Sequence, residues 1–361
     1  DALRQASLSS NVQVYSSSSV DSKGEITDSM QLRSSQLIES SEIISETIKD
    51  DILTLTIRAK INEPGDSCDF TAAQYRKKIA ATLFQLQHPE HLGVVDYYNF
   101  DKGISTEILK RLSKTGNYLT REANDISLYE TPSQAPFISK VTATDDTLLS
   151  QIALNRNVQY VISGVIRDLS AEIESDRSNY TSYLPSFNAF WGNQRKATKR
   201  NLVIDFFLHD TLTGELLSKT HYSHSVYDTN VIPEQTIAFG TKAFFDTPYG
   251  QLFDRILNLE TANIQKLLSC RPFTMKVIDQ KDGKLYLDAG ISNKVRAGDV
   301  LTIYIPDKPG EVFGVTGSVD QFGSPKTSIK INQVYPAYST AIAESGSFSN
   351  QDIINGFLIA W

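Results

Sequence analysis

The chain has 361 residues, of which 40% are hydrophobic, 10% aromatic and 21% charged, and its formal net charge is −7 at pH 7. This composition is typical of a folded protein with two or three domains and excludes collagenous, coiled-coil and disordered chains. The acidic balance excludes a global attraction to nucleic acid, so none is predicted as a partner. Because no apolar run approaches the roughly 18 residues that cross a bilayer, no membrane span is predicted.

Residues 1–66 are predicted to form a small α+β N-terminal domain. A helical pattern in the first six residues leads into a serine-rich stretch at 16–22. Apolar and polar side chains then alternate over 52–61, which predicts a half-buried strand, and residues 42–48 are expected to pair with it as a hairpin. The sequence Asn-Glu-Pro-Gly-Asp at 62–66 indicates a domain boundary.

Residues 67–270 alternate strand and helix signals, which predicts a middle domain of the α/β or α+β type built on a sheet. Residues 158–166 are apolar at most positions, as expected for a strand that is covered on both faces. Helical spacing of apolar residues predicts helices at 104–112, at 144–152 and, most clearly, at 249–267.

Residues 271–361 change character, because turn signals recur every dozen residues between short β-branched runs. No helical period is present in this stretch. The pattern predicts a small all-β C-terminal domain, either a barrel or a sandwich.

The five histidines and the acidic residues do not indicate a catalytic or metal site. His88 and His91 flank Glu90 with a three-residue spacing, but Pro89 and the Leu-Gly pair at 92–93 favour a loop over a helix that would join them. No nucleophile elbow, zinc-binding helix motif, dinucleotide fingerprint or phosphate-binding lysine loop occurs. We therefore predict no catalytic residues, no metal ligands and no cofactor.

Only two cysteines occur, and they lie at the edges of the predicted middle domain. Cys68 follows the first boundary and Cys270 precedes the second. In a reducing compartment two such distant thiols would be independent. In an oxidising compartment they would be able to close a loop of about 200 residues, which in the chain-entropy model contributes several kcal/mol.

A polar segment at 176–199 interleaves basic residues with aromatic ones, among them Tyr183, Phe190 and Trp191. These aromatic side chains either pack on their own domain or contact a partner protein. Single-stranded nucleic acid is a weaker alternative, because the chain is acidic and carries no RNA-binding signature.

Several segments together resemble the FlgT family of flagellar proteins, which build the H ring around the basal body. They are SCDF at 67–70, QYRKK at 74–78, QYVISGVIRDL at 159–169, LLSC at 267–270 and INQVY at 331–335. Their order and spacing cover nearly the whole chain, although the first 60 residues match mainly in pattern. The resemblance implies a small α+β domain, a middle domain with a mixed sheet like the N-terminal domain of TolB, and a small β-rich domain.

The resemblance also implies a non-catalytic periplasmic protein that reinforces the LP ring and supports the T ring and stators. Its partners would be these basal-body proteins, other H-ring proteins and copies of itself. In this compartment Cys68 and Cys270 are expected to be bonded, after removal of a signal peptide. The alternative is a periplasmic ligand-binding protein or enzyme with an unrecognised site.

The sequence departs from the family in two places. Residue 1 falls inside the expected first helix, so the first strand of the N-terminal domain is expected to be missing, and 176–199 resembles an insertion. Tyr183, Phe190 and Trp191 in that insertion are the candidate partner-binding residues.

Overall fold

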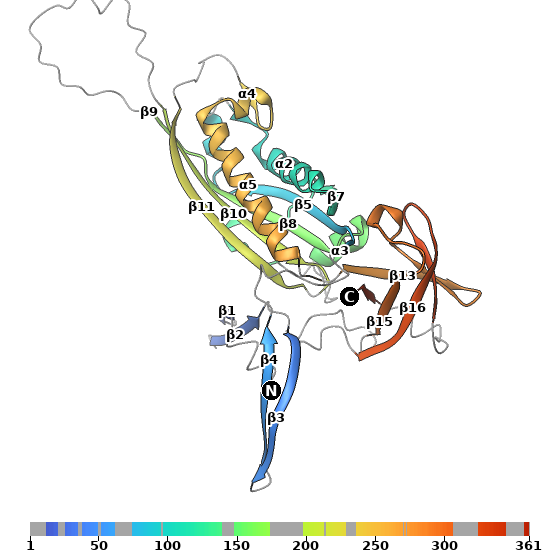
Figure 1. The fold of residues 1–361 in the computed structure, drawn as a ribbon. Coiled ribbons are helices and arrows are strands. Elements are labelled where there is room, and N and C mark those ends of the chain that lie inside the picture. Colours follow the sequence, from blue (N-terminus) through green and yellow to red (C-terminus); the bar gives the residue numbers. More distant parts are fainter. Residues whose placement is uncertain are drawn as a thin grey trace, which may run out of the picture. The chain divides into compact units, whose positions relative to one another are not determined.

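The computed structural model describes residues 12–20, 26–34, 38–49, 52–61, 74–94, 97–138, 148–173, 198–212, 214–228, 236–269, 271, 273–305, 324–343 and 357–360. The chain divides into two units (Figure 1). The sheet unit comprises residues 77–211 and 216–265, and the barrel unit comprises residues 1–76, 212–215 and 266–361.

A mixed sheet forms the sheet unit, with strands in the order β11-β10-β8-β5-β7 and β9 paired to β10. The central strand β8 is parallel to β5 and antiparallel to β10, and β5 is also parallel to β7. The strands are β5 (Lys77–Leu86), β7 (Tyr118–Ala123), β8 (Tyr160–Asp168), β9 (Ala171–Ile173), β10 (Thr198–Asp210) and β11 (Leu216–Asp228). The mixed sheet predicted for this part of the chain is confirmed.

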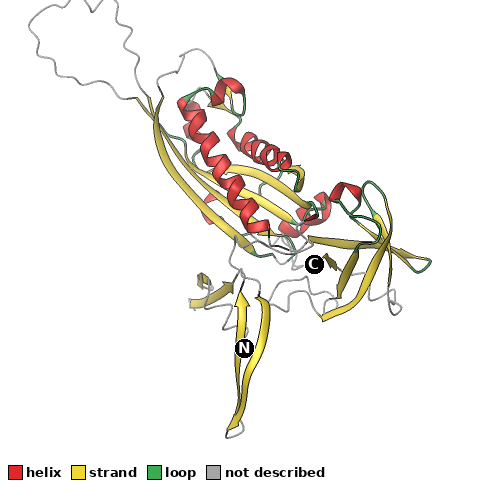
Figure 2. Cartoon of the chain, viewed as in Figure 1, coloured by secondary structure: helices red, strands yellow, loops and turns green. Residues whose placement is uncertain are grey.

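Helices α2 (Phe100–Lys114) and α5 (Pro248–Ser269) lie over the same face of this sheet (Figure 2). The predicted helices at 104–112 and 249–267 are therefore confirmed. The helix α3 (Leu148–Arg156) agrees with the predicted helix at 144–152 from residue 148 on, and residues 144–147 lie outside the described part of the chain. The remaining short elements are η2 (Pro89–Val94), β6 (Tyr97–Tyr98), η3 (Pro132–Gln134), β12 (Ile237–Ala238) and α4 (Lys242–Phe245).

The core of the sheet unit has two layers, one on each face of β8. Every residue from Tyr160 to Ile166 is buried, which confirms a strand covered on both faces. On the helical face, Phe100 lies within 6.4 Å, between ring centroids, of four aromatic residues of the α4–α5 region, namely Phe239, Phe244, Tyr249 and Phe253. On the opposite face, the ring of Tyr129 packs edge-on against Phe207 with centroids 5.6 Å apart.

In the barrel unit, six strands close into a barrel in the order β13-β14-β17-β16-β15-β18. The strands are β13 (Phe273–Lys281), β14 (Lys284–Leu287), β15 (Val300–Ile305), β16 (Ser324–Val334), β17 (Ser339–Ala343) and β18 (Phe357–Ala360), with η5 (Ile291–Asn293) between β14 and β15. A barrel therefore forms, and not the alternative sandwich.

Tyr75 packs in the barrel core, although the sequence had grouped it with the middle domain. Its ring stacks on Phe273 with centroids 5.0 Å apart. The neighbouring Arg76 exchanges two hydrogen bonds with Asn293, since its backbone N–H donates to the Asn293 carbonyl and its carbonyl accepts from the Asn293 side chain, both at 3.0 Å. The chain thus contributes to the barrel before it enters the mixed sheet.

Two antiparallel hairpins precede residue 62. They are β1 (Val12–Val20) with β2 (Ile26–Ser34), and β3 (Ile38–Lys49) with β4 (Ile52–Ile61). The predicted hairpin before residue 62 is confirmed and begins earlier than expected. The serine-rich stretch is partly a strand, because β1 contains Ser16 to Ser19, and the predicted initial helix lies outside the described residues.

Gly164, at the centre of β8, generates a prediction about packing. A Cβ placed there would lie 2.0 Å from the Phe84 ring and 2.6 Å from the Asp205 carbonyl oxygen. We expect Gly164→Ala to lower the free energy of unfolding by about 3 kcal/mol, because the close-packed core has no room for a methyl group. Chemical denaturation followed by circular dichroism measures this change.

The matched control is Gly116→Ala, where no atom lies within 4 Å of the added Cβ and only the left-handed backbone (φ 75°) opposes the change. Its expected cost is about 1 kcal/mol. Equal effects of the two substitutions would contradict the packing argument.

Candidate functional site

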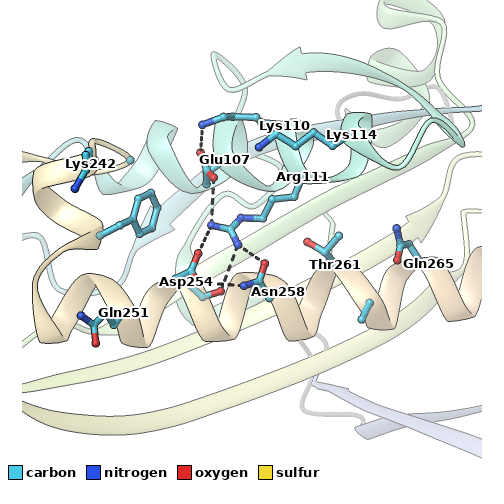
Figure 3. Close-up of a pocket in the computed structure, with 13 residues that line it drawn as sticks. Glu107, Lys110, Arg111, Lys114, Lys242, Gln251, Asp254, Asn258, Thr261 and Gln265 are labelled. Atoms are coloured by element: carbon cyan, nitrogen blue, oxygen red, sulfur yellow. Dashed lines mark hydrogen bonds and ion pairs between the residues drawn. The ribbon is translucent and has the colours of Figure 1, made fainter.

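A groove of about 720 Å³ lies between α2 and α5 (Figure 3). Most of its lining is polar, and the side chains come from α2, from the segment around α4 and from α5. The lining residues are Glu107, Lys110, Arg111, Lys114, Gly240, Lys242, Phe245, Gln251, Asp254, Asn258, Thr261, Ala262 and Gln265.

Arg111 is the centre of this groove and links the two helices. Its Nη2 lies 2.8 Å from Oδ1 of Asp254 and 3.2 Å from Oε1 of Glu107, and its Nη1 donates to Asn258. Its guanidinium carbon also lies 5.7 Å from the centroid of the Phe245 ring. The side chains of Arg111 and Glu107 are only 12% and 10% exposed, so this charged network is largely withdrawn from water.

Lysines surround this network and set the charge of the groove. The lining has four cationic side chains, which are those of Lys110, Arg111, Lys114 and Lys242. Its two carboxylates belong to Glu107 and Asp254, so the net charge of the lining is +2. The lining residues include no histidine, cysteine or serine. The groove therefore has the chemistry to bind an anionic group.

A second polar cluster is buried on the opposite face of the sheet. The Tyr129 hydroxyl lies 2.6 Å from the Ser163 hydroxyl and 3.2 Å from Nε2 of His209. Burial lowers the pKa of His209 to about 3 and raises the pKa of Tyr129. Although a serine and a histidine meet here, all three residues are buried, so the cluster is a satisfied core network.

The residues chosen from the sequence as candidate sites lie outside the described part of the chain. This holds for Cys68, Cys270, Tyr183, Phe190 and Trp191. The disulfide and the partner-binding loop stay predictions.

The histidine segment differs from its prediction. The expectation of a loop after His88 is wrong, because η2 begins at Pro89, where proline suits the first position of a helix. The His91 N–H donates to the His88 carbonyl at 3.1 Å, and the two imidazole rings stack with centroids 4.9 Å apart. His221 and His224 both lie in the extended strand β11.

Sequence reasoning missed the groove between α2 and α5. The spacing of Glu107, Lys110, Arg111 and Lys114 places all four on one side of a helix, which was the available signal. Nothing in the sequence indicated that α5, more than 130 residues later, would supply Asp254 and Asn258.

Comparison with known proteins identifies part of the chain. Residues 67–227 match the family model described as "Flagellar assembly protein T, middle domain". No curated protein matches the chain.

Solved structures show only distant similarity. The hypothetical protein CT253 from Chlamydia trachomatis is 13% identical, with 53% of this chain and 98% of that chain covered and a TM-score of 0.32. The PelC dodecamer from Paraburkholderia phytofirmans is 11% identical over 54% of this chain and 89% of its own, with a TM-score of 0.27. TolB from Acinetobacter baumannii is 10% identical, with 76% of this chain and 50% of that chain covered and a TM-score of 0.22. At such scores these similarities support no argument about this chain.

The fold and the groove define a multidomain α+β protein whose described surface is suited to binding. Within the described residues, no helix is long and apolar enough to cross a membrane. Through this match, residues 67–227 are assigned to the middle domain of the FlgT family of flagellar assembly proteins.

His209 generates a prediction about acid stability. Its pKa is about 3 in the folded chain and about 6.5 when unfolded, so between these pH values the unfolded chain binds the extra proton. Its contribution to stability is therefore present above pH 6.5 and is lost as the pH falls, at up to about 1.4 kcal/mol per pH unit.

Denaturant titrations at several pH values between 7 and 4 measure this slope. In His209→Gln, whose amide does not titrate, we expect a shallower dependence on pH. A variant with the same slope as the wild-type chain would show that other groups control acid unfolding.

Proposed function

We propose that this protein is a structural subunit of the flagellar basal body, located in the H ring in the periplasm. There it reinforces the LP ring and supports attachment of the T ring and the stators. The match of residues 67–227 to the middle domain of flagellar assembly protein T is the observation that supports this proposal. The assignment to a flagellar assembly family comes from this match, and the position within the basal body is the proposed part.

The chemistry of the described surface is compatible with a structural role. The groove between α2 and α5 offers charge for binding, and the serine–histidine cluster is buried where no substrate reaches it. The cationic lining is also the one observation that favours the alternative function, a periplasmic protein that binds an anionic ligand.

A ring requires head-to-tail contacts whose rotation closes, and each contact can be weak when a preformed scaffold holds the neighbours close. We therefore propose that the protein is a monomer in dilute solution and forms its ring only on the basal body. The 176–199 segment, with Tyr183, Phe190 and Trp191, is the proposed partner-facing surface.

The experiment replaces these three aromatic residues with serine in the chromosomal gene. We expect the purified variant to keep its circular dichroism spectrum and the cells to lose most of the protein from isolated basal bodies, because the aromatic contacts to the neighbour are removed. Quantitative immunoblotting of basal bodies, together with electron microscopy of the outer ring, measures the loss.

The matched control replaces three exposed aromatic residues of the sheet unit, Tyr98, Phe137 and Tyr227, with serine. This control is expected to leave recovery unchanged. Normal recovery of the Tyr183/Phe190/Trp191 variant would contradict the proposal that this segment faces a partner. An intact outer ring in a strain that lacks the protein would contradict the H-ring function.

The proposed compartment also predicts the state of the cysteines. In periplasmic material we expect Cys68 and Cys270 to be joined by a disulfide, which mass spectrometry of unreduced peptides detects as one cross-linked pair. Two free thiols in that material would overturn the pairing.

A further inference from the structure

The end of β5 and the end of β8 bring four potential metal-binding side chains together. These strands are parallel neighbours, with Leu86 paired to Ile166, so the residues that follow them meet at the same edge of the sheet. His88, Glu90 and His91 follow β5, and Asp168 is the last residue of β8.

Three of these side chains are within reach of one ion. One ligand atom each from His88, Glu90 and His91 lies within 4.8 Å of the other two. Nδ1 of His88 is only 2.8 Å from Oε1 of Glu90. Ligand atoms around a tetrahedral zinc ion are roughly 3.3 Å apart, so side-chain rotations of the half-buried histidines and the exposed Glu90 would bring the three atoms to that spacing.

Helical geometry explains why the two histidines face the same way. In a 3₁₀ turn, residues three apart are eclipsed. The His91 N–H bond to the His88 carbonyl closes such a turn, and the two rings consequently stack with an angle of 23° between their planes.

Asp168 provides an independent observation. Its Oδ1 lies 3.2 Å from Nδ1 of His91 and also accepts the Ser170 N–H at 2.7 Å. The Leu169 N–H also points to this Nδ1, at 3.4 Å. When Nδ1 carries a proton and donates it to the carboxylate, the lone pair is left on Nε2, which is the arrangement typical of zinc-bound histidine.

The backbone beneath the cluster is held in place by β8. The Gln87 N–H donates to the Ile166 carbonyl at 2.9 Å, and Nη1 of Arg167 donates to the Gln87 side chain, also at 2.9 Å. The residue before His88 and the residue before Asp168 are therefore joined directly. Such support reduces the ordering that a bound ion would have to impose.

We propose that His88, Glu90 and His91 bind one zinc ion, with Asp168 orienting His91 from outside the ligand set. Two imidazoles and one carboxylate are suitable donors for Zn²⁺, and water completes the four ligands. Magnesium is a poor fit, because it prefers oxygen ligands in octahedral geometry. This proposal revises the expectation of no metal ligands and does not depend on the basal-body function.

Isothermal titration calorimetry of the full chain with ZnCl₂ tests the proposal, using protein purified without a histidine tag and dialysed against chelator. We expect one equivalent of zinc to bind with a Kd in the micromolar range and MgCl₂ to give no saturable heat. His88→Ala and His91→Ala should each weaken zinc binding at least tenfold, and Asp168→Asn should weaken it about tenfold or more.

The matched control is His224→Ala, which removes an exposed histidine from β11 and should leave the Kd unchanged. Circular dichroism checks that each variant is folded. Absence of saturable zinc binding to the wild-type chain, or wild-type affinity in both His88→Ala and His91→Ala, would overturn the site. Unchanged affinity in Asp168→Asn would overturn the role given to that carboxylate.

Discussion

The close approach of Phe84 to Gly164 is the constraint on which the sheet unit depends. The Phe84 ring occupies the space that a side chain at 164 would take, and it meets Phe206 edge-on with ring centroids 5.2 Å apart. Through Phe206 the contact continues to Tyr222, whose hydroxyl donates to Glu260 on α5. One missing side chain in β8 thus allows β5, β10, β11 and α5 to share a core.

The same sheet separates two kinds of polar chemistry. On the helical face, lysines around the largely buried Arg111 network give the groove a net positive charge, which suits contact with an anionic group. On the other face, Asp205 is buried between Arg167 and His221, at 2.8 and 2.6 Å, and Tyr129, Ser163 and His209 satisfy one another nearby. The buried groups on the second face stabilise the sheet, because each has a hydrogen-bond partner.

The family match and the structure divide the chain differently. The matching region begins at residue 67, whereas Tyr75 and Arg76 contribute to the barrel and the sheet begins at Lys77. The QYRKK motif therefore spans the passage from one unit to the other, with its tyrosine stacked in the barrel and its lysines in β5.

The sequence by itself determined the local elements, because period-two and helical patterns report which face of a segment is buried. It predicted the β3–β4 hairpin, the buried strand β8, the helices α2 and α5 and the all-β C-terminal part. Only the tertiary structure decided which distant segments meet: Tyr75 with Phe273, Arg111 with Asp254, and His91 with Asp168. Such pairs depend on strand order and on which face a helix covers, and periodicity along one segment contains no information about either.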